Sequence, residues 1–513
     1  MSFEVASGWG RVVTARAAAG IRGNRWWTLG AMCFGLILIN LDITIINTAL
    51  PTIQRKLHAS PSMLEWTVNA YALALAVLLL LAGSLGDRYG RRLVFLTGMA
   101  LFTAFSAACA LAPSAGWLVA LRAGQGAGAA FIAALTLSII VTTFEPRELP
   151  QAIGIYAGVS AVALAIGPLV GGTLTEHAGW ASIFWINVPF GIAGIVLAVL
   201  AVTESRSAHS LELDPVGATL ATVALFCVVW ALIGTNHHAW TSGYTLGFLA
   251  ASVVLGAAFV WWEERHRAPM VPLVFFRNRW FTVPALAQSL FFLALFGDIY
   301  LMTLYFQNVR GWSPVQSGAS GLPMTMMMMI LAPFGGWMQR RFRPVALVTA
   351  GLGAATVGLL GLVRLGAHTS FWYIAPLYVL QGLGMAIALP ASSSIAMAAV
   401  DRQRSGMASG VLNSSRQVGA ALGLAVMGAI GSTLAMRHWE SHTPAAVHHG
   451  AVRDAVIGGQ TRVIQRLLGS DAGRVAGDAF VSGVRGAMWA ATGLTLLATL
   501  LVWLGLGRRA KPA

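Results

Sequence analysis

Apolar residues occur along this sequence in long blocks that short polar segments separate. A helix needs about 20 mostly apolar residues to cross the hydrocarbon core of a bilayer. The chain contains fourteen blocks of this kind, which are too long to be strands. The pattern therefore predicts an all-α membrane protein with fourteen spans. The predicted spans cover approximately residues 27–49, 66–86, 93–112, 117–142, 152–175, 183–202, 215–234, 244–262, 281–305, 317–338, 345–365, 372–398, 409–434 and 484–505.

The composition agrees with a protein embedded in a lipid bilayer. Of the 513 residues, 57% are hydrophobic and 10% are charged, against about 25% charged in an average soluble protein. The net charge of +15 would suggest nucleic-acid binding in a soluble protein. Here the arginines form short clusters between apolar blocks, as topology signals do, so we expect no nucleic-acid partner.

The distribution of basic residues predicts the orientation in the membrane. With a cytoplasmic N-terminus, most of the 33 lysine and arginine residues fall on the inner side. The short outer loops then hold only Arg55, Lys56, Arg310 and Arg364. Basic residues are enriched in cytoplasmic loops. We therefore expect both termini to be cytoplasmic, in the cytoplasmic membrane of a bacterium.

An internal repeat divides the chain into two halves. Gln125-Gly126 recurs as Gln381-Gly382, and Asp298 follows Asp42 at the same offset of 256 residues. Parallel repeats around a midplane cavity are typical of secondary transporters, so we expect a monomer of two six-helix bundles with two helices inserted between them. The predicted parts are a cytoplasmic tail (1–26), a first bundle (27–205), the inserted helices (206–270), a second bundle with a long outer loop at 436–483 (271–505), and a second cytoplasmic tail (506–513).

Glycines recur in register in the predicted spans 152–175 and 409–434. Small residues allow helix backbones to approach closely, which two moving bundles require; ordinary packing in a static protein is the alternative. The glycines are Gly154, Gly158, Gly167 and Gly171, and then Gly406, Gly410, Gly419 and Gly423.

The long outer loop contains a cluster of histidines, which raises the possibility of a metal site. Only His438 and His442 have the spacing of neighbours on a helix, so a solvated loop is the favoured interpretation, with a short amphipathic helix near 451–468. The other two are His448 and His449. We expect no metal and no cofactor.

The sequence lacks a phosphate-binding loop for a nucleotide, which limits the energy sources that could drive transport. A phosphate-binding loop of the type GxxxxGK[ST] needs a lysine after a glycine, and neither Lys56 nor Lys511 follows one. The chain therefore has to use an ion gradient or transport its substrate downhill.

Three of the ionisable residues within predicted spans are assigned to proton coupling, because such groups are costly in a membrane and by default functional. Asp42 can gain and lose a proton, as a proton carrier must; a structural role with hydrogen bonds to Thr44 or Asn47 is the alternative. Arg122 needs buried partners, which are either the acidic site or backbone carbonyls. Asp298 is predicted to lie across the cavity from Asp42 and to bind a cationic substrate or a second proton.

Several motifs resemble those of the major facilitator superfamily and its fourteen-span drug:proton antiporters. The loop 83–92 is similar to the superfamily's signature loop, and residues 41–51 and 122–126 resemble the antiporters' first-span and fourth-span motifs. The fifth-span antiporter motif is matched by Gly158, Gly167, Pro168, Gly171 and Gly172.

The resemblance implies roles for these positions. Asp42 and Arg122 would take part in proton coupling, and the signature loop would control the conformational change. Asp87 would meet the end of the span 409–434 and favour an outward-facing state. Two departures are Ala181, where the family commonly has arginine, and Gln339, where the second copy of the signature loop lacks an acid. The conformational residues are Gly83, Asp87, Arg88, Gly90, Arg91 and Arg92.

Polar residues inside the spans are candidates for the substrate cavity. They are Asn47, Gln125, Asp298, Tyr300, Arg416 and Gln417. The methionine-rich run 324–329 presents soft side chains on every face of a helix, which suits a promiscuous surface, although core or lipid contact is the alternative for any single one. Aromatic candidates are Tyr300, Tyr305, Trp185 and Phe291.

Together these features predict a proton-coupled secondary exporter of small hydrophobic compounds, cationic ones included, that works by alternating access. A dedicated exporter of one self-made metabolite or lipid is an alternative, and so is a membrane sensor or scaffold that does not transport. We expect no enzyme, because no catalytic nucleophile, metal or phosphate-binding constellation occurs in the sequence.

Overall fold

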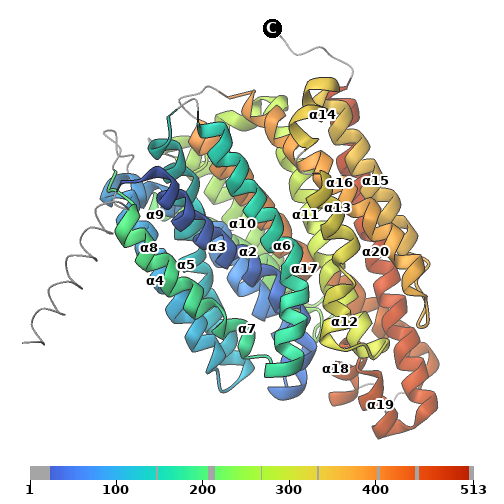
Figure 1. Cartoon of the computed structure of the whole chain (residues 1–513). Helices are drawn as coiled ribbons and strands as arrows, with labels where there is room; N and C mark the ends of the chain where they lie inside the picture. The colour runs from blue at the N-terminus through green and yellow to red at the C-terminus, as the bar shows by residue number, and fades with distance from the viewer. Residues whose placement is uncertain are drawn as a thin grey trace, which may run out of the picture.

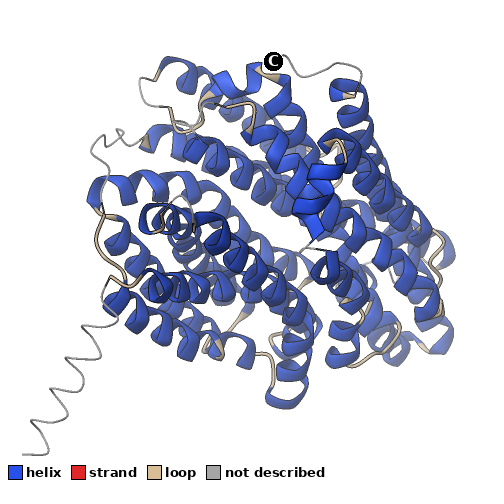
Figure 2. Cartoon of the chain, turned by 45° about the horizontal axis from the view of Figure 1, so that its top comes forward, coloured by secondary structure: helices blue, strands red, loops and turns tan. Residues whose placement is uncertain are grey.

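The computed structural model describes residues 23–145, 148–205, 214–266, 269–331, 334–400, 405–444, 447 and 450–507. Within these ranges the regular elements are all helices, as Figure 2 shows. The first half contains α2 (Arg25–Lys56), α3 (Pro61–Tyr89), α4 (Arg91–Ala110), α5 (Ala115–Thr143), α6 (Leu149–Ala178), α7 (Ser182–Trp185) and α8 (Asn187–Ala201). The insertion contains α9 (Pro215–Gly234) and α10 (Gly243–Arg265). The second half contains η1 (Leu273–Arg277), α11 (Arg279–Leu304), η2 (Tyr305–Val309), α12 (Pro314–Ala319), α13 (Leu322–Leu331), α14 (Gly335–Arg341), α15 (Pro344–Leu362), α16 (Phe371–Met397), α17 (Ser405–His442), α18 (Ala451–Ile457), α19 (Thr461–Leu468) and α20 (Ser470–Leu506).

Many of the long helices begin with the same local device. A serine, asparagine or aspartate side chain accepts a hydrogen bond from a backbone N–H of the first turn, as Asn24 does at α2 and Ser370 does at α16. This satisfies a donor that the helix itself leaves free. A tryptophan lies in that first turn of α2, α5, α11 and α16, which is typical of residues at a membrane interface.

Twelve described helical segments are long and apolar enough to cross a membrane. They coincide with twelve of the fourteen predicted spans. The predicted span 152–175 lies within α6, a helix of 30 residues. The predicted span 317–338 is divided among α12, α13 and α14. A total of fourteen spans therefore stays a prediction.

The break in the predicted span 317–338 has a local cause. The helix α12 ends at Ala319, and α13 begins only at Leu322, just before Pro323. Proline has no N–H to donate to the preceding turn, and its ring clashes with that turn. The expectation of one continuous helix over this segment is wrong.

The two halves form two bundles that lie side by side (Figure 1). Each has its own core, made of α2, α3, α4, α5 and α8 in one and of α11, α15, α16 and α20 in the other. The repeat is visible in the packing. Gly98 lies against the carbonyl oxygen of Gly128 where α4 meets α5, and Gly351 lies against that of Gly384 where α15 meets α16.

The inserted helices pack on the seam between the bundles. α9 contacts α3 of the first bundle and α17 of the second, and its Val229 and Ile233 share a buried cluster with Leu73 and Ala425. α10 packs mainly against α9 and is largely exposed. The hairpin is therefore attached to both bundles through α9.

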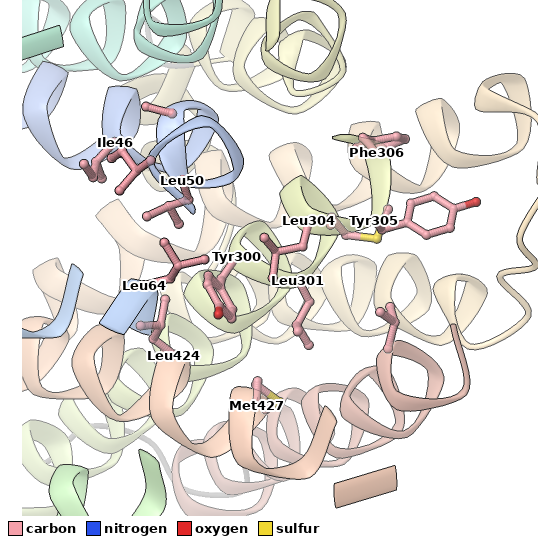
Figure 3. Packing of buried hydrophobic residues seen from close by; sticks show 14 of the residues in the cluster. Ile46, Leu50, Leu64, Tyr300, Leu301, Leu304, Tyr305, Phe306, Leu424 and Met427 are labelled. Carbon is pink, nitrogen blue, oxygen red and sulfur yellow. The ribbon is translucent and has the colours of Figure 1, made fainter. Parts of the chain in front are cut away.

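The bundles are joined at one end of the molecule. We call the end with Arg25 and Leu506 the terminal end, and the end with α18 and α19 the distal end (Figure 1). In the distal half a single apolar cluster combines α2 and α3 with α11 and α17, through residues such as Leu50, Tyr300 and Met427 (Figure 3). The described core clusters of the terminal half each belong to one bundle. The described structure is therefore closed at the distal end.

The outer loop is shorter than the predicted 436–483. α17 continues to His442, and α20 begins at Ser470, so both helices extend beyond the apolar blocks that marked the spans. The intervening residues contain α18 and α19, close to the expected amphipathic segment. Trp439 is fully buried against this segment, in a cluster with Val456.

The close helix crossings at glycine predict that two glycine-to-alanine substitutions differ in their effect on the stability of the protein. In Gly384→Ala the new Cβ would lie 2.5 Å from the carbonyl oxygen of Gly351, and such overpacking costs about 1–3 kcal/mol. A Cβ on Gly353 would have no atom within 4 Å, so Gly353→Ala should be neutral or slightly stabilising. Thermal unfolding in detergent followed by size-exclusion fluorescence should show a lower midpoint for Gly384→Ala only. Equal midpoints for the two variants would contradict the packing.

Candidate functional site

The centre of the first bundle contains a buried ion pair between Asp42 of α2 and Arg122 of α5. Arg122 Nη1 lies 2.5 Å from Asp42 Oδ2. The side chain of Asp42 is 3% exposed and that of Arg122 is 1% exposed. The structure thus brings together Asp42 and Arg122, which were assigned to one site from the sequence, and their role in proton coupling stays a prediction. Because an unpaired charge at this depth would be very costly, each side chain determines the position of the other.

Arg122 makes further contacts that fix the orientation of its guanidinium group. Its Nε donates to the carbonyl oxygen of Thr67 at 3.1 Å, and its Nη1 also donates to Gln125 Oε1 at 2.7 Å. The guanidinium lies 4.2 Å from the centre of the Tyr71 ring, where a cation is attracted to the π electrons. Arg122 therefore bonds to both of its expected kinds of partner, the acidic residue Asp42 and a backbone carbonyl group.

Asp42 accepts two further hydrogen bonds at Oδ1. Gln125 Nε2 donates at 2.8 Å, and Asn187 Nδ2 of α8 donates at 3.1 Å. Both amides also donate to Ser106 Oγ, at 3.2 and 3.0 Å. Sequence reasoning assigned no role to Ser106 or Asn187; the available signal was that both are polar residues within apolar blocks.

The alternative prediction was a structural role for Asp42 with hydrogen bonds to Thr44 or Asn47, and neither residue bonds to Asp42. Thr44 Oγ1 donates to the carbonyl oxygens of Asn40 and Leu41. Asn47 Nδ2 donates to the carbonyl oxygen of Ile43. Both side chains bond to their own helix, because a hydroxyl or amide inside a helix readily reaches the preceding turn.

A cavity lies between the two bundles, next to this cluster. The space free of protein atoms measures about 870 Å³, which includes space open to solvent. α2 contributes Ile43, Thr44 and Asn47 to its wall, while Asp42 points away from it into the first bundle. The remaining wall residues are Thr48, Pro168, Leu295, Phe296, Asp298, Ile299, Met302, Thr303, Phe306, Ser317, Gly318, Ser320, Gly321, Met324, Thr325, Met328, Tyr378 and Met385.

Asp298 is the acidic residue of the cavity wall. It is 1% exposed, and within the described residues neither of its carboxylate oxygens has a hydrogen-bond partner by geometry. Gln381, the repeat partner of Gln125, also has an unpaired amide nitrogen. Tyr378 stands in the second half where Arg122 stands in the first. The repeat therefore reproduces the acid and the amide without the cation.

Half of the methionine run faces the cavity. Met324 and Met328, one helical turn apart on α13, belong to the wall. Met326 and Met329 are on the exposed side, 49% and 44% exposed. The members of the run therefore divide between the cavity wall and the exposed surface, and a role of the run in binding substrates stays a prediction.

Four of the residues expected in the cavity do not line it. Gln125 is bonded into the Asp42 cluster, and Tyr300 is packed in the apolar cluster of the distal half. Arg416 is held within the second bundle, where its Nε donates to Gln288 Oε1 at 2.5 Å. Gln417, on the next position of α17, is also absent from the wall. Asn47 and Asp298 are placed as expected.

The aromatic candidates were also wrong. Tyr305 donates its hydroxyl to the carbonyl oxygen of Gly366, Phe291 is buried in the core of the second bundle, and Trp185 is 45% exposed. The aromatic wall is formed by Phe296, Phe306 and Tyr378. Helical periodicity alone did not distinguish the faces, because all of these blocks are apolar on every side.

The fifth-span motif packs on both bundles. Gly167 and Gly171 of α6 lie against Thr44 and Thr48 of α2. Gly172 lies against Pro314 of α12, in the other bundle. The corresponding contact from α12 is made by Gly318, which approaches the carbonyl oxygen of Pro168. The surroundings of Gly158 lie outside the described residues.

The signature loop is held by a residue that the sequence did not indicate. Glu204, after α8, accepts hydrogen bonds from the backbone N–H groups of Arg92 and Leu93, at 3.1 and 3.2 Å. A carboxylate is favourable at a helix N-terminus, here that of α4. Gly90 has a φ of +120°, and a Cβ there would meet Glu204 Oε1 at 2.6 Å, so glycine is required.

The other residues of this loop show no common arrangement. Arg88 lies over the Tyr89 ring at 5.6 Å, and the backbone N–H of Arg91 donates to the carbonyl oxygen of Ser205. A Cβ on Gly83 would have no neighbour within 4 Å. The side chain of Asp87 lies outside the described residues, and so does its expected contact with the end of α17.

The resemblance favoured an outward-facing state, whereas the described structure is closed at the distal end. The distal end is the outer one only under the expected orientation, so the favoured state stays a prediction. At the distal end the apolar cluster of α2, α3, α11 and α17 buries large side chains of both bundles, and apolar burial favours the closed arrangement.

No group of three or more potential metal ligands occurs among the described residues. The rings of His438 and His442 stack with their centres 4.3 Å apart. His448 and His449 lie outside the described residues. The three cysteines are free and buried.

Comparison with known proteins identifies relatives over nearly the whole chain. The family model of the Major Facilitator Superfamily matches residues 32–424. The tetracenomycin C resistance and export protein of Streptomyces glaucescens is 36% identical, over 96% of this chain and 94% of that protein. The multidrug resistance protein Stp of Mycobacterium tuberculosis (strain CDC 1551 / Oshkosh) is 34% identical, over 93% and 91%. A bacterial homologue of the human lysosomal transporter Spinster, solved in an inward-facing and unoccupied conformation, has a TM-score of 0.67 at 18% identity, over 95% of this chain and 99% of that one.

The buried ion pair predicts a strongly non-additive double-mutant cycle. Arg122→Gln leaves Asp42 charged and unpaired, and losing one partner of a buried pair costs about 3–5 kcal/mol. Combining it with Asp42→Asn removes both charges and should recover part of the lost stability. Thermal unfolding of the two single variants and the double variant measures the coupling. Additive losses would show that the two charges do not stabilise each other.

Proposed function

The chain belongs to the Major Facilitator Superfamily, and we propose that it is a proton-coupled exporter of small hydrophobic compounds, cationic ones included. Its relatives are drug resistance and efflux proteins of this superfamily, and its many apolar helices suit a multi-pass protein of the bacterial inner membrane. The further elements of the proposal are both termini in the cytoplasm, a single copy as the working unit, no nucleic-acid partner and no enzymatic activity.

The single observation that carries the proposal is the position of the Asp42–Arg122 pair. Asp42 lies on one face of α2, and Thr44 and Asn47 of the same helix line the cavity. A proton taken up by Asp42 removes one charge of the pair, while Arg122 keeps its bonds to Gln125 and Thr67. A change in the packing of α2 against α5 is then transmitted directly to the cavity wall.

The glycines of α6 provide the second requirement, a sliding contact. Gly167 and Gly171 bring α6 close to α2, and Gly172 brings it close to α12 of the other bundle. Alternating access needs the two bundles to rock around a central site. Backbone contacts without bulky side chains permit this movement with little repacking.

The direction of transport follows from the proposed orientation. With the termini inside, the distal end faces the outside, and a proton that enters from there gains about 2.3 kcal/mol per 100 mV of membrane potential, in addition to its pH gradient. Protonation of the Asp42 cluster from outside favours the return to the inward-open state. The substrate, bound from the cytoplasm, leaves as the proton enters.

The cavity wall supports the proposed substrate class. Its methionines and phenylalanines offer adaptable apolar contacts, which accept hydrophobic compounds of different shapes. Asp298 supplies a negative charge, and neither of its two oxygens accepts a hydrogen bond of normal geometry from the described residues, although the Gln381 side chain lies close to it. A cationic substrate would pair with this carboxylate; a second transported proton would neutralise it instead.

Asp42→Asn should abolish proton-driven efflux, because an amide cannot carry the proton. The assay is efflux of a fluorescent cationic dye from proteoliposomes with an imposed pH gradient. Asp471→Asn, at a carboxyl group that is 89% exposed, is the matched control and should retain full activity. Undiminished gradient-driven efflux by Asp42→Asn would exclude the proposed role.

Asp298→Asn should discriminate between substrates by charge. Losing a buried charge-assisted contact costs a cation about 1.5–3 kcal/mol, which is roughly a 10- to 100-fold weaker apparent affinity. Neutral hydrophobic substrates should be transported as before. A panel of charged and neutral compounds in the same vesicles makes this comparison. An equal loss for both classes would assign Asp298 to proton transport instead.

A further inference from the structure

Glu65 is a second buried carboxylate of the first bundle, and neither the resemblance nor the sequence pattern assigned it a role. It lies in the first turns of α3, one position before the predicted span 66–86, so the pattern placed it in a loop. In the structure it is 2% exposed. It lines a small cavity at the distal end together with Tyr300 of α11, Gly428 of α17 and Ile457 of α18.

The carboxylate of Glu65 is poorly satisfied. Its Oε1 accepts one long hydrogen bond, 3.4 Å, from Asn236 Nδ2 of the inserted segment. Its Oε2 has no hydrogen-bond partner, and within the described residues Glu65 forms no ion pair. Asp42, by contrast, has Arg122 and two amides. The effective cost of burying a carboxylate without such partners is several kcal/mol.

Three parts of the molecule meet at this carboxylate. Gly428 of α17 lies directly opposite, since a Cβ on it would be 2.7 Å from Glu65 Oε1. Asn236, next to α9, also donates to Ser62 Oγ at 3.1 Å. Arg453 of α18 donates to the carbonyl oxygen of Asn236 at 2.8 Å. Glu65 is therefore covered by the second bundle, the insertion and the outer loop when the distal end is closed.

The groups around Glu65 leave few electrostatic partners. From α11 the titratable group that faces it is Tyr300, and from α18 the charged group is Arg453, which is bonded to Asn236. α17 presents Gly428, Gly431 and Ser432, and α20 presents Phe480 and Val484. Among the described hydrogen bonds of Glu65 and Asn236, Arg453 is the cation involved, and it reaches Glu65 only through Asn236.

We propose that Glu65 is a proton-linked latch of the distal end, which holds a proton when the two bundles are closed there and releases it when they separate. The inference rests on the proposed function, because it assumes that the bundles part at this end during transport. Opening moves α17 away from α3 and gives the carboxylate water. Closing removes that water, and the carboxyl group then has to be neutral.

The sign of the pH dependence follows from linkage. The closed state binds the proton more tightly than the open state. Acidic conditions on the distal side therefore stabilise the closed state, and this stabilisation is lost as the pH rises. For an exporter with its distal end outside, external acid would thus favour the return to the inward-open state, in the same direction as the proton gradient.

A distance measurement between the bundles tests the latch. Nitroxide labels at Met63→Cys on α3 and Arg437→Cys on α17, both at the distal end and exposed, report its opening in nanodiscs. Raising the pH from mildly acidic to mildly alkaline should increase the open fraction at least about threefold. In Glu65→Gln, which mimics the neutral group, the shift should fall to the part that Asp42 contributes, and the closed distance should predominate at both pH values. An unchanged shift in Glu65→Gln, or no shift in the parent chain, would overturn the proposal.

Two controls make the result specific. Glu440→Gln changes an exposed carboxylate of α17 near the same end and should leave the pH shift intact.

A second measurement of the protonation of Glu65 needs no variant. Dicyclohexylcarbodiimide reacts with protonated carboxyl groups in apolar surroundings, so peptide mapping should find Glu65 modified several times more at mildly acidic than at mildly alkaline pH. Modification that does not depend on pH would also overturn the latch.

The latch and the proposed function fail in distinguishable ways. The distance measurement uses no substrate and no gradient, so it can succeed in a chain that does not export. Dye efflux by the parent chain and its loss in Asp42→Asn test the exporter. Efflux together with a pH shift that is unchanged in Glu65→Gln would retain the exporter and exclude the latch.

Discussion

A charge that is buried in a membrane protein has to find a partner, and in this chain the partner of Asp42 is Arg122. The ion pair, with Gln125, Asn187 and Ser106 around it, connects α2, α4, α5 and α8. These are the helices of the first bundle's core. α2 also forms part of the cavity wall, and in the proposed mechanism it links the protonation state of a single carboxyl group to the shape of the cavity.

The two halves differ in how they accommodate a buried carboxylate. The second bundle repeats the acid and the amide as Asp298 and Gln381, but Tyr378 replaces the arginine. Its carboxylate has no internal cation among the described residues and faces the cavity. One half therefore contains a buried acid that an arginine compensates, and the other contains a carboxylate without such a cation, which in the proposed mechanism a transported cation or a proton neutralises. An asymmetry of this kind gives two halves of one fold distinct tasks.

The sequence predicted the fold well, because apolar blocks of span length and arginine clusters carry most of that information. It also singled out Asp42 and Arg122, since ionisable residues within spans are rare, with the acidic site as one of two alternative partners for Arg122. It did not predict Glu65, which lies at the border of a block, or Glu204, which caps α4 from outside any span. The cavity wall was only partly predicted: Tyr300, Arg416 and Gln417 were assigned to it, although they pack elsewhere. Blocks that are apolar on every face contain no periodic signal to show which side of a helix meets the cavity, so that information comes only from tertiary packing.

The central claim is that Asp42 takes up a proton and gives it up again when substrate binds. Infrared difference spectroscopy of the protein in nanodiscs observes this group directly, with Asp42→Asn to assign the band. The account predicts a protonated-carboxyl band that appears on acidification, decreases when a cationic substrate is added, and is absent in Asp42→Asn. A band that belongs to Asp42 and does not respond to substrate, or the absence of any such band at acidic pH, would contradict it.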